Sequence, residues 1–373
     1  MRHRRHVLLL SALTILLAGS SPAAANERIQ IASIFAFSGT AAVTNGPSAQ
    51  GVRWAVQEVN AGGGIAGRPL DLLEIDNAST PIGSKIAAEK AATAKVAAII
   101  GPAYSSHCIA AARVAQRQHI PLITNIATDP DVTRVGDFIF RVCFSDTFQS
   151  KLLARFASQE LGIHTAAILV NANSDYSLGL ARDFRLHFEQ MGGRLTQDMY
   201  YKERQDSFDE FIAAIKASGP PLIFIPGHLK SALIAKRLVE AGVAATFLGG
   251  DGWDIDDFQR MGGDTIPLGY YTTHWMEEMQ TQRSRQFVKR YGGNHILTSS
   301  CALAYDATML LADAIARAGS SQHDAIRQAL AGTDGFQGVT GKISLDSNGD
   351  PIKPAVIIKI VKGRFSYLKQ VKP

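Results

Sequence analysis

Short apolar runs alternate with helix-like stretches along almost the whole chain of 373 residues. Such alternation is typical of β-α units, whose strands pair in parallel and whose helices cover the sheet. In the first part of the chain we expect strands at 28–35, 69–76, 96–100, 120–124 and 137–144. Helices are expected between these strands, at 49–61, at 82–94 and from about residue 106 onward.

The same alternation then begins again, which predicts a second sheet. Its strands are expected at 165–170, 193–201, 221–226, 245–250 and 268–273, and its helices at 149–161, 179–191, 208–218 and 230–242. Further helices are predicted at 282–291, 299–318 and 322–331, followed by strands joined by an Asn-Gly turn. The expected fold class is therefore α/β, with two Rossmann-like lobes built on parallel central sheets.

Residues 1–25 have the features of a secretory signal peptide. A basic start precedes an apolar core at 7–17 that is too short to span a bilayer, and Ala23 and Ala25 supply a cleavage site. An uncleaved anchor is the alternative. Ser20 stands where a lipoprotein carries its lipidated cysteine, so we expect a soluble exported protein with no direct membrane anchor.

The charge of the chain argues against nucleic acid as a partner. The formal net charge is +5, but removal of the signal peptide leaves 35 basic residues against 33 acidic ones. A mature chain this close to neutral, with no later run of basic residues, is not expected to have a basic surface for nucleic acid.

The chain contains three cysteines, Cys108, Cys143 and Cys301. They form no C-x-x-C pair and no Cys/His cluster with the spacing of a metal site. In an oxidising compartment they form one disulfide and a free thiol; otherwise they are three buried thiols.

Polar residues follow several expected strands, where the ligand sites of open parallel sheets gather. The stretch GPAYSS, 101–106, places Ser105 just past a buried strand and at the start of a helix. A hydrolase nucleophile is disfavoured because the G-x-S-x-G spacing is absent and His107 is adjacent in sequence. Ser105 is then a helix N-cap, or an N-cap that also binds an anion such as a carboxylate.

The loop TNIATD, 124–129, follows the next strand. Thr128 supplies a hydroxyl and an N–H, and Ile126 supplies a backbone carbonyl. The loop is a plain turn, or it lies beside Ser105 on the adjacent strand and completes a pocket with donors and an acceptor.

In the second half, Asp251 lies between glycines just after a predicted strand. It is either a turn residue or, in a cleft, a carboxylate that faces a cation. The nearby Asp254, Asp256 and Asp257 lack the spacing of an EF-hand loop, and no phosphate-binding loop of the G-x-x-x-x-G-K-[ST] type occurs in the chain. We expect neither a metal nor a cofactor.

Three more side chains follow strands of the second half. Tyr176 and His228 are pocket residues, or else a surface tyrosine and a helix-capping histidine. Trp253 forms a pocket wall or packs on a loop. Hydroxyls and amides from the first half and a carboxylate from the second would together suit a zwitterion.

An ordered set of motifs resembles the periplasmic substrate-binding proteins of branched-chain amino acid ABC transporters, the leucine/isoleucine/valine-binding type. The motifs are FSGTAA, AVQEVNAGGGIAGRPL, IIGPAYSS, IPLITNIATDPDVTRVGDFIFR, DYSLGLA, FLGGDGWD, AYDATMLLADAIARAG and GVTGKISLDSNGD. The resemblance covers nearly all of the mature chain and implies a type I periplasmic binding fold that closes on its ligand. The implied crossovers fall near 143–146, 271–275 and 350–353. The N-terminal lobe would then hold 26–143 and 274–350, and the C-terminal lobe 146–272 and 353–373.

The resemblance also assigns ligand-binding roles to single positions. They are Tyr104, Ser105, Ile126, Thr128, Tyr176, His228 and Asp251. Ser105 and Thr128 match the carboxylate site, whereas the Ile126 carbonyl and Asp251 match the acceptors of the ligand ammonium. Tyr176 matches a tyrosine that closes over the ligand.

The positions around the ligand side chain depart from the family pattern. Tyr104 falls at a position whose side chain shapes the pocket in related proteins. His228 replaces an expected tyrosine, and Thr44 and Ser300 stand where relatives can carry aromatic residues. These departures affect side-chain selectivity more than recognition of the amino-acid headgroup.

The predicted function is a soluble periplasmic receptor that binds an amino acid, branched-chain or otherwise apolar, between two closing lobes. It would deliver this ligand to the membrane permease of an ABC transporter. A receptor or sensor for a small amide or an aromatic acid on the same fold is the alternative. An enzyme is disfavoured because no catalytic constellation emerges from the sequence.

Overall fold

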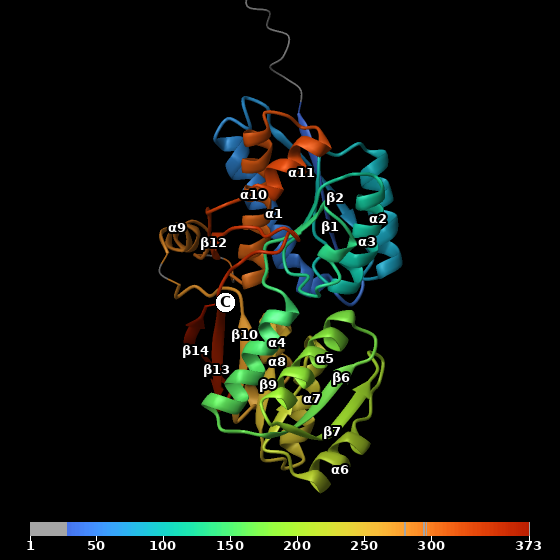
Figure 1. Cartoon of the computed structure of the whole chain (residues 1–373), viewed down its shortest axis with the longest axis vertical. Coiled ribbons are helices and arrows are strands. Elements are labelled where there is room, and N and C mark those ends of the chain that lie inside the picture. The colour runs from blue at the N-terminus through green and yellow to red at the C-terminus, as the bar shows by residue number, and fades with distance from the viewer. Residues whose placement is uncertain (1–27, 280, 294, 296, 373) are drawn as a thin grey trace, which may run out of the picture.

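The computed structural model describes residues 28–279, 281–293, 295 and 297–372. Two α/β halves lie end to end along the long axis of the molecule, and each half is built around its own sheet (Figure 1). The predicted signal peptide, 1–25, lies outside the described residues.

The first sheet has the strand order β2-β1-β3-β4-β5, and its paired strands are parallel. Its strands are β1 Ile29–Phe35, β2 Leu70–Asp76, β3 Ile99–Ile100, β4 Leu122–Thr124 and β5 Ile139–Arg141. The helices of this half are α1 Ala42–Ala61, α2 Pro81–Thr93, α3 Ser105–Arg117, α9 Gln282–Tyr291, α10 Ser299–Ala318 and α11 His323–Ala331. The hairpin of β11 Phe336–Gly338 and β12 Gly341–Ile343 belongs to the same half.

Alternation of side chains along β1 divides the core of this half in two. Ile29 and Ile31 pack with residues of α1 and α10, whereas Ala32 and Ile34 pack with residues of α2 and α3. The α1–α10 contact is close, because a Cβ on Gly51 would lie 2.2 Å from the Cys301 carbonyl oxygen. Although α1 and α10 are long, neither they nor any other helix in the described part of the chain is apolar enough to cross a membrane.

The second sheet has the order β14-β13-β10-β9-β8-β6-β7. Its strands are β6 Thr165–Asn171, β7 Arg194–Tyr201, β8 Leu222–Phe224, β9 Thr246–Gly249, β10 Leu268–Thr273, β13 Ala355–Val361 and β14 Arg364–Val371. The pairs among β6 to β10 are parallel, and β13 joins β10 antiparallel. Its helices are α4 Asp146–Arg155, α5 Asp175–Gln190, α6 Asp209–Ser218, α7 Leu229–Glu240 and α8 Asp256–Met261. Residues of α4 and α5 share one core with the sheet, and residues of α6 and α7 share another.

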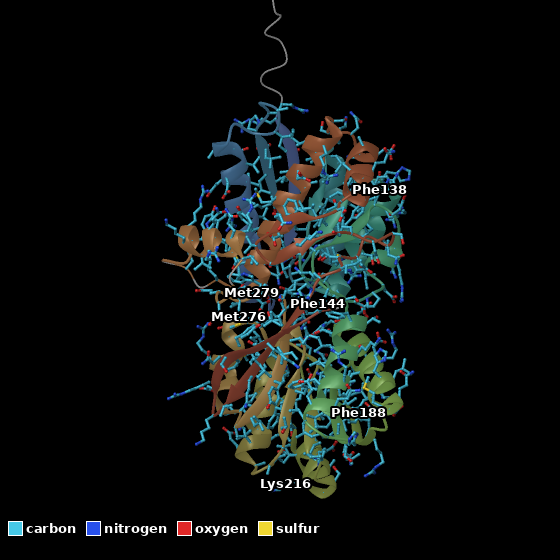
Figure 2. The ribbon with its side chains drawn as sticks, turned by 60° about the vertical axis from the view of Figure 1, so that its left-hand side comes forward. Phe138, Phe144, Phe188, Lys216, Met276 and Met279 are labelled. Atoms are coloured by element: carbon cyan, nitrogen blue, oxygen red, sulfur yellow. The ribbon has the colours of Figure 1, made fainter. Side chains whose placement is uncertain are left out.

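The chain passes between the two halves three times. It crosses within 142–145, between β5 and α4, within 274–281, between β10 and α9, and within 344–354, between β12 and β13. Figure 2 shows Phe144, Met276 and Met279 in this middle region of the molecule. The region expected for the second crossing, 271–275, overlaps the end of β10, since Tyr271 to Thr273 still pair with β13.

Other boundaries also differ from the sequence-based expectations. The helix expected from residue 49 begins at Ala42, and Pro47 lies inside it, where it costs one backbone hydrogen bond. The strand expected at 137–144 contains only Ile139–Arg141. It ends there because the chain leaves the sheet to form the first crossing.

The predicted Asn-Gly turn exists between β12 and β13, but these two strands belong to different sheets. Gly349 has a φ of +79° and its N–H donates to the Asp346 carbonyl at 3.0 Å. The strands on either side of this turn diverge, since β12 pairs with β11 and β13 pairs with β10. The hairpin of the C-terminal strands turns instead at Lys362 and Gly363, both with positive φ.

Cys108, Cys143 and Cys301 are all free and buried, which supports the second of the two cysteine hypotheses. Burial raises the pKa of the Cys108 and Cys301 thiols to about 12. Because the thiolate is the reactive form, these cysteines act as small core residues.

Candidate ligand-binding site

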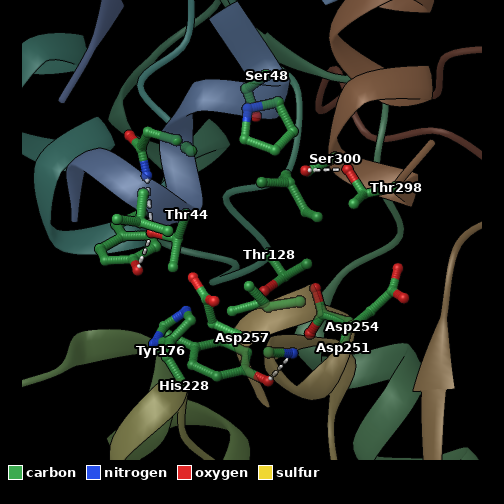
Figure 3. A pocket seen from close by; sticks show the side chains of 18 of the residues that line it. Thr44, Ser48, Thr128, Tyr176, His228, Asp251, Asp254, Asp257, Thr298 and Ser300 are labelled. Carbon is green, nitrogen blue, oxygen red and sulfur yellow. Dashed lines mark hydrogen bonds between the residues drawn. The ribbon is translucent and has the colours of Figure 1, made fainter. Parts of the chain in front are cut away.

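A cavity of about 120 Å³ lies between the two halves, at the carboxyl ends of strands from both sheets (Figure 3). All the predicted site residues line it: Tyr104, Ser105, Ile126, Thr128, Tyr176, His228 and Asp251. Other parts of the wall come from α1, from residues within 251–260 and from the start of α10. Thr44 and Ser300, which with His228 were expected to depart from the family pattern, also line this cavity.

One side of the cavity is formed where α3 begins. The extended residue Tyr104 occupies the N-cap position, so the prediction that Ser105 is the N-cap is wrong; Ser105 is the first helical residue. The Ser105 hydroxyl accepts a hydrogen bond from the Asp129 N–H at 3.2 Å. This bond fixes the 124–129 loop against α3. The first turn of a helix carries N–H groups without helical partners and a partial positive charge, both of which favour an anion.

Thr128 supplies a further donor on this side. The residue is 1% exposed, and its Oγ1 makes no hydrogen bond of good geometry in the described part of the chain, although it faces the Asp146 carboxyl and acts to lower the pKa of that group. Burying a hydroxyl without a partner is unfavourable. A ligand oxygen in the cavity would satisfy this group.

The opposite side of the cavity carries Asp251, in a 3₁₀ helix that follows β9. Its Oδ1 accepts a hydrogen bond from Gln149 Nε2 at 2.8 Å, and its Oδ2 lies 3.0 Å from His274 Nε2. The Asp251 N–H donates to Gln149 Oε1 at 3.2 Å. Asp251 therefore faces the cavity, as predicted, but it also has protein partners that the sequence did not reveal.

Two carboxyl groups near this site differ in their ionisation. Burial acts to raise the pKa of Asp251, but hydrogen bonds from His274 and Gln149 outweigh it, and the pKa lies below its ordinary value. Burial and the charge of Asp251 raise the pKa of Asp146 well above its ordinary value. The surroundings therefore favour the ionised form of Asp251, whereas Asp146 takes up a proton more readily than an ordinary carboxyl group.

Tyr176, the second residue of α5, lies against Asp251. Its hydroxyl accepts a hydrogen bond from the Gly252 N–H at 3.0 Å. Burial raises the pKa of Tyr176 well above its ordinary value, so the phenol keeps its proton. Glycine at position 252 leaves room for this contact, because a Cβ there would lie 3.1 Å from the Tyr176 hydroxyl oxygen and 2.6 Å from the Gly227 carbonyl oxygen.

Rings from the two halves meet on a third side of the cavity. Tyr104 and His228 stack with 4.3 Å between ring centroids, and the Tyr104 hydroxyl lies 2.7 Å from Thr44 Oγ1. His228 occupies the N-cap position of α7, but its side chain makes no capping hydrogen bond. Burial lowers the pKa of His228, so this ring is neutral at pH 7.

Trp253 packs in the core instead of walling the cavity. It stacks on Phe258 at 4.6 Å and donates from Nε1 to the Ile225 carbonyl.

Gln149 and His274 were not expected near the site from the sequence, and Asp254 was considered there only as part of a metal-binding loop. Gln149 looks like any polar helix residue, but His274 directly follows a predicted strand, so the strand-end rule could have found it. Asp254 lines the cavity and accepts from Thr273 Oγ1 at 2.6 Å. Burial raises its pKa to about 6. Within the part of the chain that the structure describes, no group of three or more His, Cys, Asp or Glu residues is placed to hold a metal ion.

A pair of α/β halves joined by three crossings, with a cavity between them that holds both donors and a carboxylate, defines a two-lobed solute-binding protein. Residues 28–364 match the family described as "Periplasmic binding protein", and the chain belongs to that family. It is a binding protein of this family and not an enzyme.

Similar proteins have the same architecture over nearly their whole length. The "Leu/Ile/Val-binding protein homolog 1" of Brucella abortus is 25% identical over 365 residues, covering 92% of this chain and 98% of the relative. A leucine-binding protein LivK from Thermotoga maritima superimposes with a TM-score of 0.88 at 29% identity, covering 92% of this chain and 99% of that one. The LivJ protein of Streptococcus pneumoniae, solved with isoleucine, gives 0.87 at 27% identity, with 93% and 100% coverage.

Proposed function

We propose that this protein binds an amino acid with a branched or otherwise apolar side chain between its two lobes and delivers it to an ABC permease. The observation that carries the proposal is the polarity of one buried cavity. The Thr128 hydroxyl and the start of α3 lie on one side, and the Asp251 carboxylate lies on the other. Two opposite charges on one small ligand would match this arrangement.

In the proposed complex, the ligand carboxylate accepts from the hydroxyls of Ser105 and Thr128 and from N–H groups at the start of α3. The ammonium donates to Asp251 and to the Ile126 carbonyl. Tyr176 covers the headgroup from the second lobe. Val43, Pro47, Ala103 and Ile255 also line the cavity and provide apolar surface for a side chain.

The size of the cavity supports a ligand as small as a single amino acid. One water needs roughly 10–15 Å³ of such volume, so a cavity of about 120 Å³ holds on the order of ten water-sized groups. Leucine and isoleucine are of that size. A peptide or an oligosaccharide is too large for the cavity in this form.

Two lobes move as separate bodies in this proposal: 26–143 with 274–350, and 146–272 with 353–373. The Tyr104–His228 stack is a contact that would break when they open. The ligand favours closure because it binds the closed form more tightly than the open form. Residues 1–25 would direct export to the periplasm, where a soluble receptor can meet its permease; the match to the periplasmic binding family supports this location.

The test is a thermal-shift screen of the mature protein, refolded after denaturation so that it carries no co-purified ligand. The panel contains the twenty amino acids, aromatic acids and short amides. A bound ligand raises Tm by mass action. Stabilisation by leucine, isoleucine or valine is the expected result. Stabilisation by an aromatic acid or an amide alone would replace the amino-acid assignment with the alternative ligand class.

A further inference from the structure

The Asp251 carboxylate is connected to the crossings between the lobes through a histidine. His274 is the first residue after β10, in the second crossing, and it is 1% exposed. Its Nε2 lies 3.0 Å from Asp251 Oδ2. Its ring stacks on Phe144, in the first crossing, with 3.7 Å between centroids and 28° between planes. Figure 2 labels Phe144 at the junction of the two halves.

The other oxygen of Asp251 is held from the same region. Gln149, on α4 just after the first crossing, donates to Asp251 Oδ1 at 2.8 Å. The Gln149 side chain is itself fixed, because its Oε1 accepts from Thr272 Oγ1 at 2.8 Å. Rotation of the Asp251 carboxylate would therefore break hydrogen bonds at both oxygens.

The hydrogen bond between His274 and Asp251 also indicates which ring nitrogen of His274 carries the proton. An ionised carboxylate is only an acceptor, so Nε2 must be the donor. Nδ1 has no hydrogen-bond partner among the described residues, as suits the bare nitrogen of a neutral ring. Burial lowers the pKa of His274, and the hydrogen bond to Asp251 opposes this effect only in part. A neutral imidazole donates to the carboxylate without cancelling its charge.

We propose that His274 is a positioning residue for the ligand ammonium. Its hydrogen bond fixes Asp251 in the cavity and leaves the negative charge available to the ligand. Its stack on Phe144 links that carboxylate to two of the three crossings about which the lobes move. The proposal rests on the proposed function, because it assumes a ligand with an ammonium group.

Other titratable groups surround this pair. Those facing Asp251 are Tyr176 on α5, Asp146 on α4, His228 before α7, Asp254 after the 3₁₀ helix and Cys143 in the first crossing. Lys353, in the third crossing, faces His274. These groups are the same in a His274 variant and in the wild type. The ratio of the Kd of the variant to the Kd of the wild type, taken at each pH, therefore isolates the effect of the His274–Asp251 pair.

Two variants separate the hydrogen bond from the packing. His274→Phe keeps a ring against Phe144 but removes the donor, and His274→Gln restores an N–H near the position of Nε2. For L-leucine at pH 7.5, measured by calorimetry, His274→Phe should raise Kd roughly ten- to a hundredfold, as expected for a hydrogen bond to a charged group. His274→Gln should recover most of this loss. Wild-type affinity in His274→Phe, or no recovery in His274→Gln, would overturn the proposal.

The pH dependence distinguishes positioning from a purely structural role. With one donor fewer, Asp251 takes up a proton more readily, and a protonated Asp251 cannot pair with an ammonium. The ratio of Kd in His274→Phe to Kd in the wild type should therefore increase as pH falls from 7.5 to 5.5. A ratio that stays constant over this range would contradict the proposal.

A spectroscopic measurement tests the proposal without any ligand. In protein with ¹⁵N-labelled histidine, the His274 signals, identified by their loss in His274→Phe, should show a neutral ring protonated at Nε2 at pH 7. An imidazolium or an Nδ1–H tautomer would exclude the proposed role. If the wild type shows the Nε2–H ring but does not bind any amino acid, the proposed function fails while the His274–Asp251 pairing stands.

Discussion

Replacing Asp251 by asparagine removes the proposed ammonium partner and keeps the size of the side chain. Asp251 is only 4% exposed, so water cannot replace the lost charge. Two unit charges about 3.5 Å apart interact by roughly 5 kcal/mol at an effective dielectric constant near 20. Breaking one partner of a buried ion pair costs about 3–5 kcal/mol. At about 1.4 kcal/mol per factor of ten, Asp251→Asn should weaken leucine binding by roughly two to three and a half orders of magnitude.

The assay compares leucine with 4-methylpentanoate, which has the same carbon skeleton and carboxylate but no ammonium. Calorimetry on refolded protein should show a strong preference of the wild type for leucine and a much smaller preference of Asp251→Asn. The variant should stay folded, because the amide oxygen of the substituted side chain can still accept from Gln149. An unchanged preference for leucine over 4-methylpentanoate, in a folded variant, would refute the assignment of Asp251 to the ammonium.

Three other predictions address the carboxylate site, the core and the pH response. Thr128→Val should raise Kd for leucine by roughly ten- to a hundredfold, since it removes the proposed hydroxyl donor to the ligand carboxylate; unchanged affinity in calorimetry would contradict this. Gly51→Ala should lower Tm by several degrees because its Cβ would lie 2.2 Å from the Cys301 carbonyl oxygen, whereas Gly46→Ala in the same helix meets no atom within 4 Å and should not. The Asp254 carboxyl has a folded-state pKa of about 6, above its ordinary value of 3.8; the folded state thus binds the extra proton, and its stabilising effect is lost as pH rises from about 4 to 6. Asp254→Asn should therefore gain Tm relative to the wild type as pH rises from 4.5 to 7.5, and a Tm difference that does not change with pH would oppose this.

The fold could be predicted because its main signals are local. The alternation of apolar and helical segments is sufficient to place most strands and helices and to indicate two sheets. The predicted boundaries are wrong where contacts between distant parts of the chain determine the local structure. The strand at 137–144 ends early because the chain must leave the sheet, and the Asn-Gly turn at 348–349 joins segments that pair with different strands.

The sequence predicts which residues line the site better than it predicts the hydrogen bonds among them. Strand ends and family motifs identified residues that all line one cavity. They could not show that Asp251 accepts from Gln149 and His274, since these residues are 102 and 23 positions away in the chain. The side chain of Gln149 has no local signal at all. Which polar groups share hydrogen bonds is set by how the crossings bring the two halves together.

The packing of α1 against α10 has a consequence for how the protein is made. The apolar face of α1 emerges early in synthesis, but its partner α10 begins only at Ser299, after the entire second sheet except β13 and β14 has been made. A growing chain therefore cannot complete the α1 side of the core of its first half until α10 has left the ribosome. Translation and folding are separated in time by the connectivity itself. For a chain that begins with a predicted export signal, this delay would leave the apolar face of α1 uncovered until α10 has been made, whereas the core on the α2 and α3 side could form earlier.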